Sequence, residues 1–299
     1  DLGAQATMAH LLKYDSVLGN LSNDIAAVDG GISIDDKVLK VLSERNPGEL
    51  PWGDLGVDVV IESTGIFTDR DKAAQHLDAG APLVIVSAPA SGADATIVVG
   101  VNHEEFDRES HKVISNASCT TNCFVPMVQV LDEAFGVEKG LMTTVHAYTG
   151  DQSLVDGPHS DLRRARASAV NIIPTSTGAA RATGLVLQAM NGKLDGTSLR
   201  VPIPDGSITD FTAVLTASPS VEEINAAFSS AASSAPLAGI LTYSEDPLVS
   251  ADIVGDPSSC VFDAGLTMTI DNLVKVSGWY DNEWGYSNRL VDLVTITCG

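Results

Sequence analysis

A cysteine and a histidine are the side chains in this sequence best suited to chemistry. Cys119 follows an apolar run and a short polar loop, and it begins a helix-like stretch, whose dipole should lower the pKa of the thiol. His146 ends a later apolar run, from which it could meet that thiol. A cysteine beside a histidine makes a sulfur nucleophile with acid–base help. A buried structural cysteine is the alternative. A zinc site with Cys123 fits poorly because no further ligands cluster there, and we predict no metal.

Arginines are the second group of candidates, because they are rare in this chain. It has 17 basic and 39 acidic residues and a net charge of −22. Arg163, Arg164 and Arg166 lie in an aperiodic stretch over 147–169, where a solvated charge run or a subunit contact is the alternative. Arg200 interrupts an apolar segment, and an unpaired charge there is costly. Thr177-Gly178 precedes a helix-like stretch and could cradle a phosphate. Together these features predict local anion sites.

Composition excludes several classes of protein. So acidic a surface repels phosphate backbones and anionic lipids, so we expect no nucleic-acid or membrane partner. No apolar run approaches the roughly 20 residues of a membrane span. Four cysteines in 299 residues do not make a disulfide framework, which favours a cytoplasmic protein. The length suits about two domains.

The order of the predicted elements indicates two different domains. Residues 1–118 have strand-like runs at 57–63, 83–87, 95–101 and 112–115, with a helix over 71–79 ending at Gly80. Continuous apolar strands separated by helices indicate an α/β, doubly wound parallel sheet, which binds ligands at the carboxyl ends of its strands. From Cys119 the pattern changes to a mixed α+β domain. It has helices over 119–135, after Gly178 and after Ser220, and strands over 141–146, 208–214 and 267–278.

The nonapeptide at 115–123, Ser-Asn-Ala-Ser-Cys-Thr-Thr-Asn-Cys, resembles the active-site signature of phosphorylating glyceraldehyde-3-phosphate dehydrogenases. Further family-like motifs lie, in the family's order, at 11–16, 62–65, 144–149, 161–166 and 279–286. The resemblance implies a Rossmann-like dinucleotide-binding domain over 1–118, to which a C-terminal helix over 287–299 returns, and a catalytic domain over 119–286. It also implies a glycolytic, NAD-dependent homotetramer that oxidises glyceraldehyde 3-phosphate and transfers inorganic phosphate to the product.

The resemblance also assigns roles to individual residues. Cys119 would be the nucleophile that forms a thioester, and His146 the base. The attacking phosphate would be bound by Ser118, Thr120, Thr177, Gly178 and Arg164, and the phosphate of the substrate by Thr149, Asp151 and Arg200. The cofactor contacts would be Asp1 on the adenosine ribose, Arg45, Ser87, Asn282 on the nicotinamide amide, and Tyr286 nearby.

Asp1 should also repel the 2′-phosphate of NADP, and Leu2 and Pro158 resemble the NAD-preferring forms of the family. We therefore predict a preference for NAD.

Two departures from the family stand out. The sequence starts at the ribose acid, without the family's first strand and glycine-rich turn, so we expect a longer protein of which these 299 residues alone would fold poorly and bind NAD weakly. Pro204-Asp205-Gly206-Ser207 differs from the Asn-Val-Ser common there.

Other functions remain open at this stage. They are an erythrose-4-phosphate dehydrogenase with the same Cys–His pair, a cysteine hydrolase or acyltransferase without a cofactor, and a non-catalytic scaffold.

Overall fold

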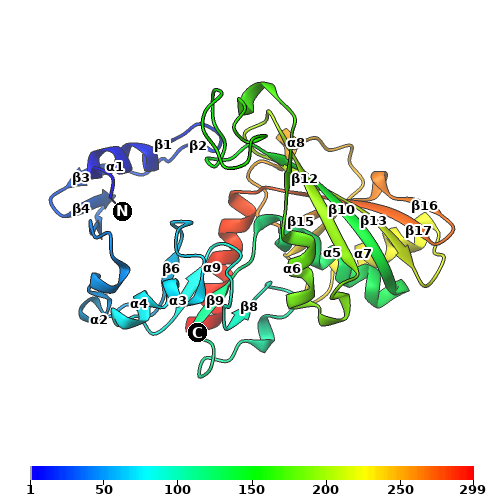
Figure 1. Cartoon of the computed structure of the whole chain (residues 1–299), viewed down its shortest axis with the longest axis horizontal. Coiled ribbons are helices and arrows are strands. Elements are labelled where there is room, and N and C mark those ends of the chain that lie inside the picture. Colours follow the sequence, from blue (N-terminus) through cyan, green and yellow to red (C-terminus); the bar gives the residue numbers. More distant parts are fainter. Residues whose placement is uncertain (1) are drawn as a thin grey trace.

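The N-terminal part of the chain is built from small elements. The computed structural model describes residues 2–299, so Asp1, with its predicted ribose contact, lies outside the described residues. Helix α1 (Gln5–Lys13) precedes a hairpin of β1 (Tyr14–Asp15) and β2 (Gly19–Asn20). A three-stranded antiparallel sheet follows, made of β3 (Ile25–Val28), β4 (Gly31–Ile34) and β5 (Lys37–Lys40). We did not predict this sheet, although Asp29-Gly30 is a strong hairpin signal. These elements, in blue, lie apart from the parallel sheet in Figure 1.

The second part is the parallel sheet that the apolar runs predicted. Its order is β6-β7-β9-β8, and all neighbours are parallel. The strands are shorter than predicted: β6 (Val60–Glu62), β7 (Val84–Val86), β8 (Ala95–Thr96) and β9 (Val113–Ser115). The helix predicted over 71–79 is interrupted at Ala74 and forms α3 (Arg70–Ala73) and α4 (Gln75–Asp78), with Gly80 at φ 97° after it. The short elements that precede β6 and follow β8 are η1 (Pro47–Glu49), α2 (Trp52–Leu55) and η2 (His103–Glu105).

The third part is an eight-stranded mixed sheet. Its order is β11-β12-β10-β13-β17-β15-β14, and β16 pairs with β17. The strand predicted over 267–278 was wrong as a single strand: it is a hairpin of β16 (Met268–Ile270) and β17 (Leu273–Tyr280), because Asp271 takes the left-handed φ of 53° that turns the chain. The other strands are β10 (Val137–Ala147), β11 (Ile173–Ser176), β12 (Leu194–Val201), β13 (Ser207–Leu215), β14 (Leu241–Ser244) and β15 (Cys260–Asp263).

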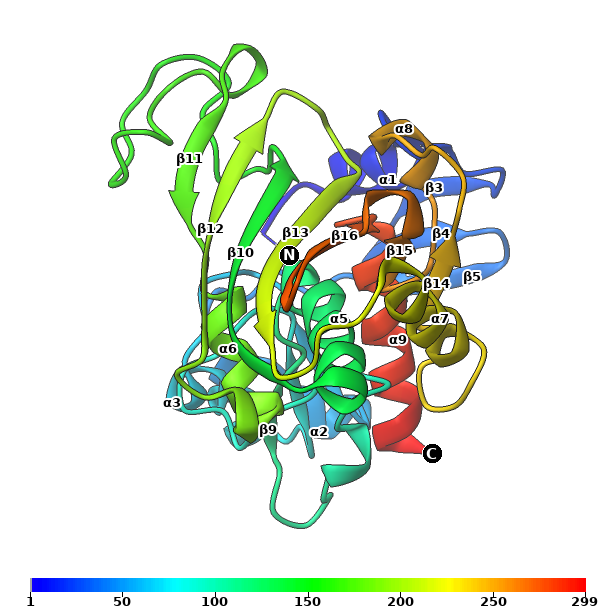
Figure 2. The same cartoon turned by 90° about the vertical axis from the view of Figure 1, so that its right-hand side faces the viewer.

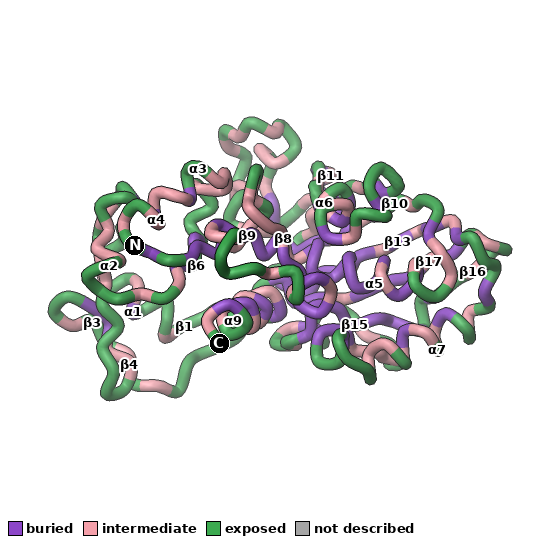
Figure 3. The backbone as a smooth tube through the Cα atoms, turned by 90° about the horizontal axis from the view of Figure 1, so that it is seen from below, coloured by how far each residue is buried: buried purple, intermediate pink, exposed green. Residues whose placement is uncertain are grey.

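Helices cover one face of this mixed sheet, and in Figure 2 they lie behind its strands. The central one is α5 (Cys119–Phe135), which spans the range predicted from the sequence. Its Phe124 packs edge-on against Phe211 of β13, with ring centroids 4.8 Å apart. Burial is densest around α5 and β13 in Figure 3. The remaining short elements and helices of this part are η3 (Ser168–Val170), α6 (Ala179–Val186), η4 (Gln188–Met190), α7 (Val221–Ala232), α8 (Ser250–Ile253) and η5 (Ala264–Leu266).

The C-terminal helix joins the two large sheets. Helix α9 (Trp284–Cys298) begins three residues before the predicted Ser287. Leu293 lies in one continuous apolar core with Ile85 and Ile114 of the parallel sheet and Phe124 of α5. Figure 1 shows α9, in red, beside β9. Within residues 2–299 the structure contains no helix that is both long and apolar enough to cross a membrane.

Candidate active site

The structure brings the predicted cysteine and histidine together. Cys119 is the first residue of α5, where the Ser118 hydroxyl accepts a hydrogen bond from Thr121 N at 3.0 Å and so fixes the start of the helix. His146 lies near the end of β10, in the centre of the mixed sheet that α5 crosses. The Cys119 Sγ lies 3.5 Å from His146 Nε2. Residues 27 positions apart therefore form one reactive pair.

The electrostatics of this pair differ from the sequence-based expectation. Burial raises the pKa of the Cys119 thiol to about 11, which outweighs the hydrogen bonds from Thr120 and the positive charge of Arg200. The N–H groups at the helix start do lower this pKa, as expected, but burial outweighs them, so the predicted net lowering was wrong. Burial, with the charge of Arg200, lowers the pKa of His146 to about 4. Both groups are thus neutral at pH 7 when no ligand is bound.

Arg200 explains part of the lowered pKa of His146, because its guanidinium lies directly against the histidine ring. Its Nη1 is 2.7 Å from His146 Nδ1 and 2.9 Å from the carbonyl oxygen of Ala147. A guanidinium only donates hydrogen bonds, so Nδ1 is the acceptor and the neutral ring carries its proton on Nε2, facing the sulfur. Arg200 Nε is buried without a hydrogen-bond partner, and Arg200 makes no ion pair within residues 2–299. A half-buried cation that forms no ion pair is suited to an anion.

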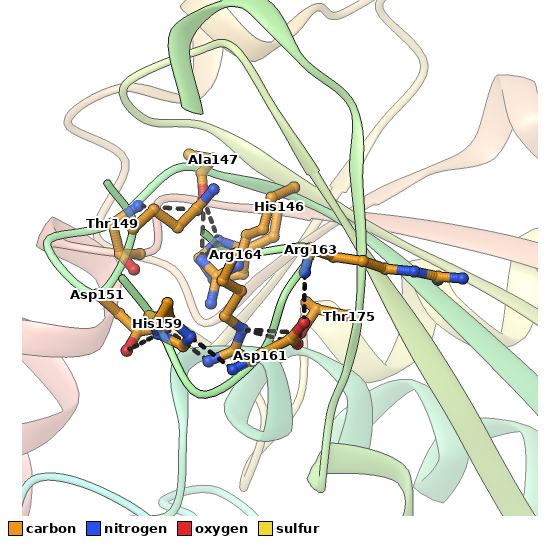
Figure 4. A network of polar contacts seen from close by, with 11 residues as sticks. His146, Ala147, Thr149, Asp151, His159, Asp161, Arg163, Arg164 and Thr175 are labelled. Carbon is orange, nitrogen blue, oxygen red and sulfur yellow. Dashed lines mark hydrogen bonds and ion pairs between the residues drawn. The ribbon is translucent and has the colours of Figure 1, made fainter. Parts of the chain in front are cut away.

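A second arginine lies in a polar network in the long segment after β10 (Figure 4). Arg164 Nη1 donates to Asp151 Oδ2 at 2.6 Å, and its Nε donates to Thr175 Oγ1 at 2.8 Å. His159 Nε2 lies 3.5 Å from the other oxygen of Asp151. The side chain of Arg163 points away from this network in Figure 4. Asp151, which the resemblance groups with Arg200, forms its ion pair with Arg164, while its charge also acts on Arg200.

The other predicted phosphate ligands vary in how available they are. Gly178 precedes α6, and no atom lies within 4 Å of the position a Cβ would take there, so the helix terminus is open. The Thr177 hydroxyl accepts from Ala179 N at 3.2 Å. Thr149 is half-buried, and its N–H donates to Gln152 Oε1 at 3.3 Å. Thr120 is buried, and its hydroxyl is already hydrogen-bonded to Tyr280.

Tyr280 is a site residue that the sequence reasoning missed. Its hydroxyl lies 2.8 Å from the hydroxyls of both Thr120 and Thr144, and its ring meets that of His146 edge-on at 5.9 Å. Tyr280 thus joins the start of α5 to β10 directly behind the Cys–His pair. The only signal for it in the sequence was its place within the motif at 279–286.

Comparison with known proteins identifies the family. The chain matches the family model "Glyceraldehyde 3-phosphate dehydrogenase, C-terminal domain" over residues 118–282, and the model of the family's NAD binding domain over residues 1–70. The chain belongs to the glyceraldehyde-3-phosphate dehydrogenase family. It is therefore an α/β oxidoreductase with an NAD-binding domain.

Relatives within the glyceraldehyde-3-phosphate dehydrogenase family match along almost the whole chain. "Glyceraldehyde-3-phosphate dehydrogenase 2" of Streptomyces arenae is 60% identical over 296 residues, which cover 99% of this chain and 88% of the relative. "Glyceraldehyde-3-phosphate dehydrogenase" of Mycolicibacterium smegmatis is 62% identical over 298 residues, which cover 99% and 87% of the two chains.

The residues near Cys119 fit the nicotinamide end of the cofactor that this family uses. Asn282 is buried, its Oδ1 accepts from Ser207 Oγ at 2.6 Å, and no hydrogen bond is formed by its Nδ2 among residues 2–299. A carboxamide could therefore accept a hydrogen bond from Asn282. The Tyr286 hydroxyl donates to Ala117 O at 3.0 Å, two residues before Cys119.

Two further residues that were predicted to contact the cofactor, Ser87 and Arg45, lie in other parts of the dehydrogenase fold. Ser87 follows β7, at the carboxyl end of the parallel sheet, where ligands of such sheets bind. Arg45 is exposed and lies in the N-terminal part. In the part of the chain that the structure describes, no three His, Cys, Asp or Glu side chains gather into a possible metal site.

Proposed function

We propose that this protein catalyses the NAD-dependent oxidation and phosphorylation of glyceraldehyde 3-phosphate to 1,3-bisphosphoglycerate in glycolysis. The observation that carries the proposal is the Cys119–His146 pair at 3.5 Å, with the unpaired guanidinium of Arg200 against the same histidine. Residues 1–118, with the C-terminal helix, would bind the dinucleotide, and residues 119–286 would supply the catalytic groups.

The first role of the chain's residues is to move the thiol proton. A substrate phosphate on Arg200 would draw the guanidinium from His146 Nδ1. The neutral imidazole would then exchange its Nε2 proton, through solvent, for one on Nδ1 that donates to Ala147 O at 2.7 Å. His146 Nε2 would be free to accept the Cys119 proton. The sulfur adds to the aldehyde carbon, and the imidazolium returns the proton to the aldehyde oxygen, which gives a hemithioacetal.

The second role is to hold the acyl group for phosphorolysis. NAD, when bound, would supply the hydride acceptor. As the hemithioacetal carbon loses its hydride, its hydroxyl proton would pass to His146 Nε2, which leaves a thioester on Cys119 and a protonated His146. Inorganic phosphate attacks the thioester carbon, the carbon–sulfur bond breaks, and Cys119 leaves as a thiolate that regains its proton from His146. Asn282 would orient the nicotinamide amide, with Tyr286 beside it, and Asp1, Arg45 and Ser87 would hold the rest of the cofactor.

Two anion sites divide the phosphates in this proposal. Thr149, Asp151 and Arg200 would hold the phosphate of the substrate, and the unpaired Arg200 Nε supports this site. Ser118, Thr120, Thr177, Gly178 and Arg164 would hold the attacking phosphate, which the open helix start at Gly178 supports. In this scheme Asp151 orients Arg164, and Thr120 is oriented by Tyr280.

We further propose a cytoplasmic homotetramer. The uncovered face of the mixed sheet supports assembly, because Leu141, Met268 and Ile270 there are 61–71% exposed. The four cysteines are free thiols, as a reducing compartment requires. Native mass spectrometry of the full-length protein tests the subunit number.

The decisive experiment measures NADH formation at 340 nm with the full-length protein. Glyceraldehyde 3-phosphate should give NADH at a rate that depends on inorganic phosphate, and erythrose 4-phosphate should be a poorer substrate. Higher kcat/KM for erythrose 4-phosphate would favour the second dehydrogenase. Thioester hydrolysis by Cys119 without any NADH would instead support a hydrolase.

A further inference from the structure

The segment before β13 departs from the family's common sequence, and it lies buried beside the proposed cofactor site. Asp205 is 3% exposed, and its Oδ1 accepts a hydrogen bond from Gly206 N at 2.8 Å. Within residues 2–299 no N–H or alcohol O–H group donates to its buried Oδ2. Gly206 has φ 81°, and a Cβ there would meet the carbonyl oxygen of Ser250 at 2.2 Å. The valine common in the family therefore does not fit this backbone, and the segment packs tightly against α8.

The neighbour of Asp205 is a second carboxyl group, that of Asp281, with which it is in hydrogen-bonding contact. Asp281 accepts three backbone hydrogen bonds, from Glu283 N at 2.8 Å, Trp284 N at 2.7 Å and Gly255 N at 2.7 Å. Both oxygens of Asp281 therefore already act as hydrogen-bond acceptors. Two touching carboxylates cannot both be ionised without a large cost, so the proton belongs on Asp205, whose free oxygen needs one.

The surrounding charges reinforce this assignment. Glu283 faces the pair from the same turn as Asp281, and burial raises the pKa of Glu283 as well. Asp252 of α8 and Asp256 of the following loop are also acidic, and their carboxylates accept from Val249 N and Ser258 N. Within residues 2–299 neither Asp205 nor Asp281 forms an ion pair with a basic residue. Burial, with Asp281 and Glu283, raises the pKa of Asp205 to about 7.

The pair of Asp205 and Asp281 lies next to Asn282. It connects the start of β13 to the end of β17, the two strand ends that position the Asn282 side chain. Asp281 is adjacent to Asn282 and fixes the turn between β17 and α9. Ser207, two residues after Asp205, accepts from Ala147 N at 3.1 Å and donates to Asn282 Oδ1 at 2.6 Å. A bond between Asp205 and Asp281 therefore holds the start of β13 against the end of β17, and Asn282 lies between the two connections.

We propose that Asp205 is a positioning residue, which as a carboxylic acid donates its proton to Asp281 and thereby holds Asn282 for the cofactor. The inference rests on the proposed function only in giving Asn282 to the nicotinamide. When Asp205 loses its proton, two buried negative charges meet, and their repulsion displaces the segments that flank the Ser207–Tyr280 strand pair, Asn282 included. Cofactor binding is then linked to one proton, and its affinity falls by at most about tenfold per pH unit above the pKa.

Asp205→Asn in the full-length enzyme is the matched test, because it keeps the shape and supplies an N–H donor that does not titrate. Titration of NAD should show the wild-type Kd rising about tenfold between pH 6 and pH 8.5, while the variant changes less than about twofold. Asp252→Asn, which removes an exposed carboxylate on the adjacent α8, should keep the wild-type pH dependence.

Thermal melting without cofactor gives a second, independent readout. The pKa of Asp205 is higher in the folded state than in the unfolded chain, so the wild-type protein loses stability as pH rises from about 4 through about 7. Asp205→Asn removes this loss and should therefore melt above the wild type at pH 8, by more than at pH 5.

Each outcome bears on the proposal. Identical pH profiles for wild type and Asp205→Asn, in either readout, would overturn it. Identical melting profiles would show that Asp205 does not carry the proton, and identical NAD-binding profiles would show that it does not position Asn282. Absence of NAD binding by both proteins at every pH would overturn the proposed function and the role of Asn282 with it. The melting profiles would then still show whether Asp205 carries the proton.

Discussion

Replacement of Arg200 by leucine tests how the substrate phosphate is bound. Arg200 forms no ion pair within residues 2–299, although the charge of Asp151 reaches it, and its Nε is buried without a hydrogen-bond partner. A charge-assisted hydrogen bond to phosphate contributes about 1.5–3 kcal/mol. Since about 1.4 kcal/mol is tenfold in affinity, Arg200→Leu should raise the KM for glyceraldehyde 3-phosphate by about 10- to 150-fold.

The same substitution should act on His146 in a second, separable way. Arg200 lies 2.7 Å from His146 Nδ1 and helps to lower the pKa of that imidazole to about 4. Without the guanidinium this pKa should rise toward the ordinary value of about 6.5. His146 must be unprotonated to accept the thiol proton, so the acid limb of the kcat/KM profile should move to higher pH.

Steady-state kinetics with two aldehydes separate these effects. Glyceraldehyde has no phosphate, so at pH 8 its kcat/KM should change less than about threefold in Arg200→Leu, well below the loss expected for a charged hydrogen bond. Arg163→Leu is the control, because that side chain points away from the polar network in Figure 4, and it should leave both substrates unaffected. An equal loss on both aldehydes at pH 8 would refute the phosphate contact and show that Arg200 acts only through His146.

Three further predictions concern the nucleophile, its support and the cofactor. Cys119→Ser should lower kcat by several orders of magnitude while Cys298→Ser leaves it unchanged, because only Cys119 lies against His146; activity that survives in Cys119→Ser would contradict its role. Tyr280→Phe removes the hydroxyl between Thr120 and Thr144 and should destabilise the fold by about 1–3 kcal/mol in urea unfolding, with a lower kcat; wild-type stability would show that these hydrogen bonds contribute nothing. NAD should be preferred over NADP because Asp1 would repel the 2′-phosphate, and equal kcat/KM for the two cofactors would count against that.

Local patterns in the sequence were enough to predict the α/β class, the parallel sheet and α5. A run such as Leu83–Ser87 is apolar throughout because both faces of its strand are buried, and Ser118 caps the helix that follows β9. Cys119 and His146 were predicted as candidates because their residue types carry chemistry and each stands at the end of an element. Their roles, and those of the phosphate ligands, came from the family motifs.

Only the tertiary structure decided the contacts that set protonation. The pKa of Cys119 was predicted from the helix terminus alone, but burial dominates it. On either side of Cys119, Cys123 contacts Gly278 of β17 and Ala117 contacts Tyr286 of α9, from 155 and 169 residues away. The hairpin of β16 and β17 depends on a left-handed Asp271, which the apolar alternation of 267–278 conceals. Tyr280 behind His146 and the acid pair of Asp205 and Asp281 join residues far apart in the chain. Sequence spacing carries no information about such contacts, because they exist only once the sheet has brought the strand ends together.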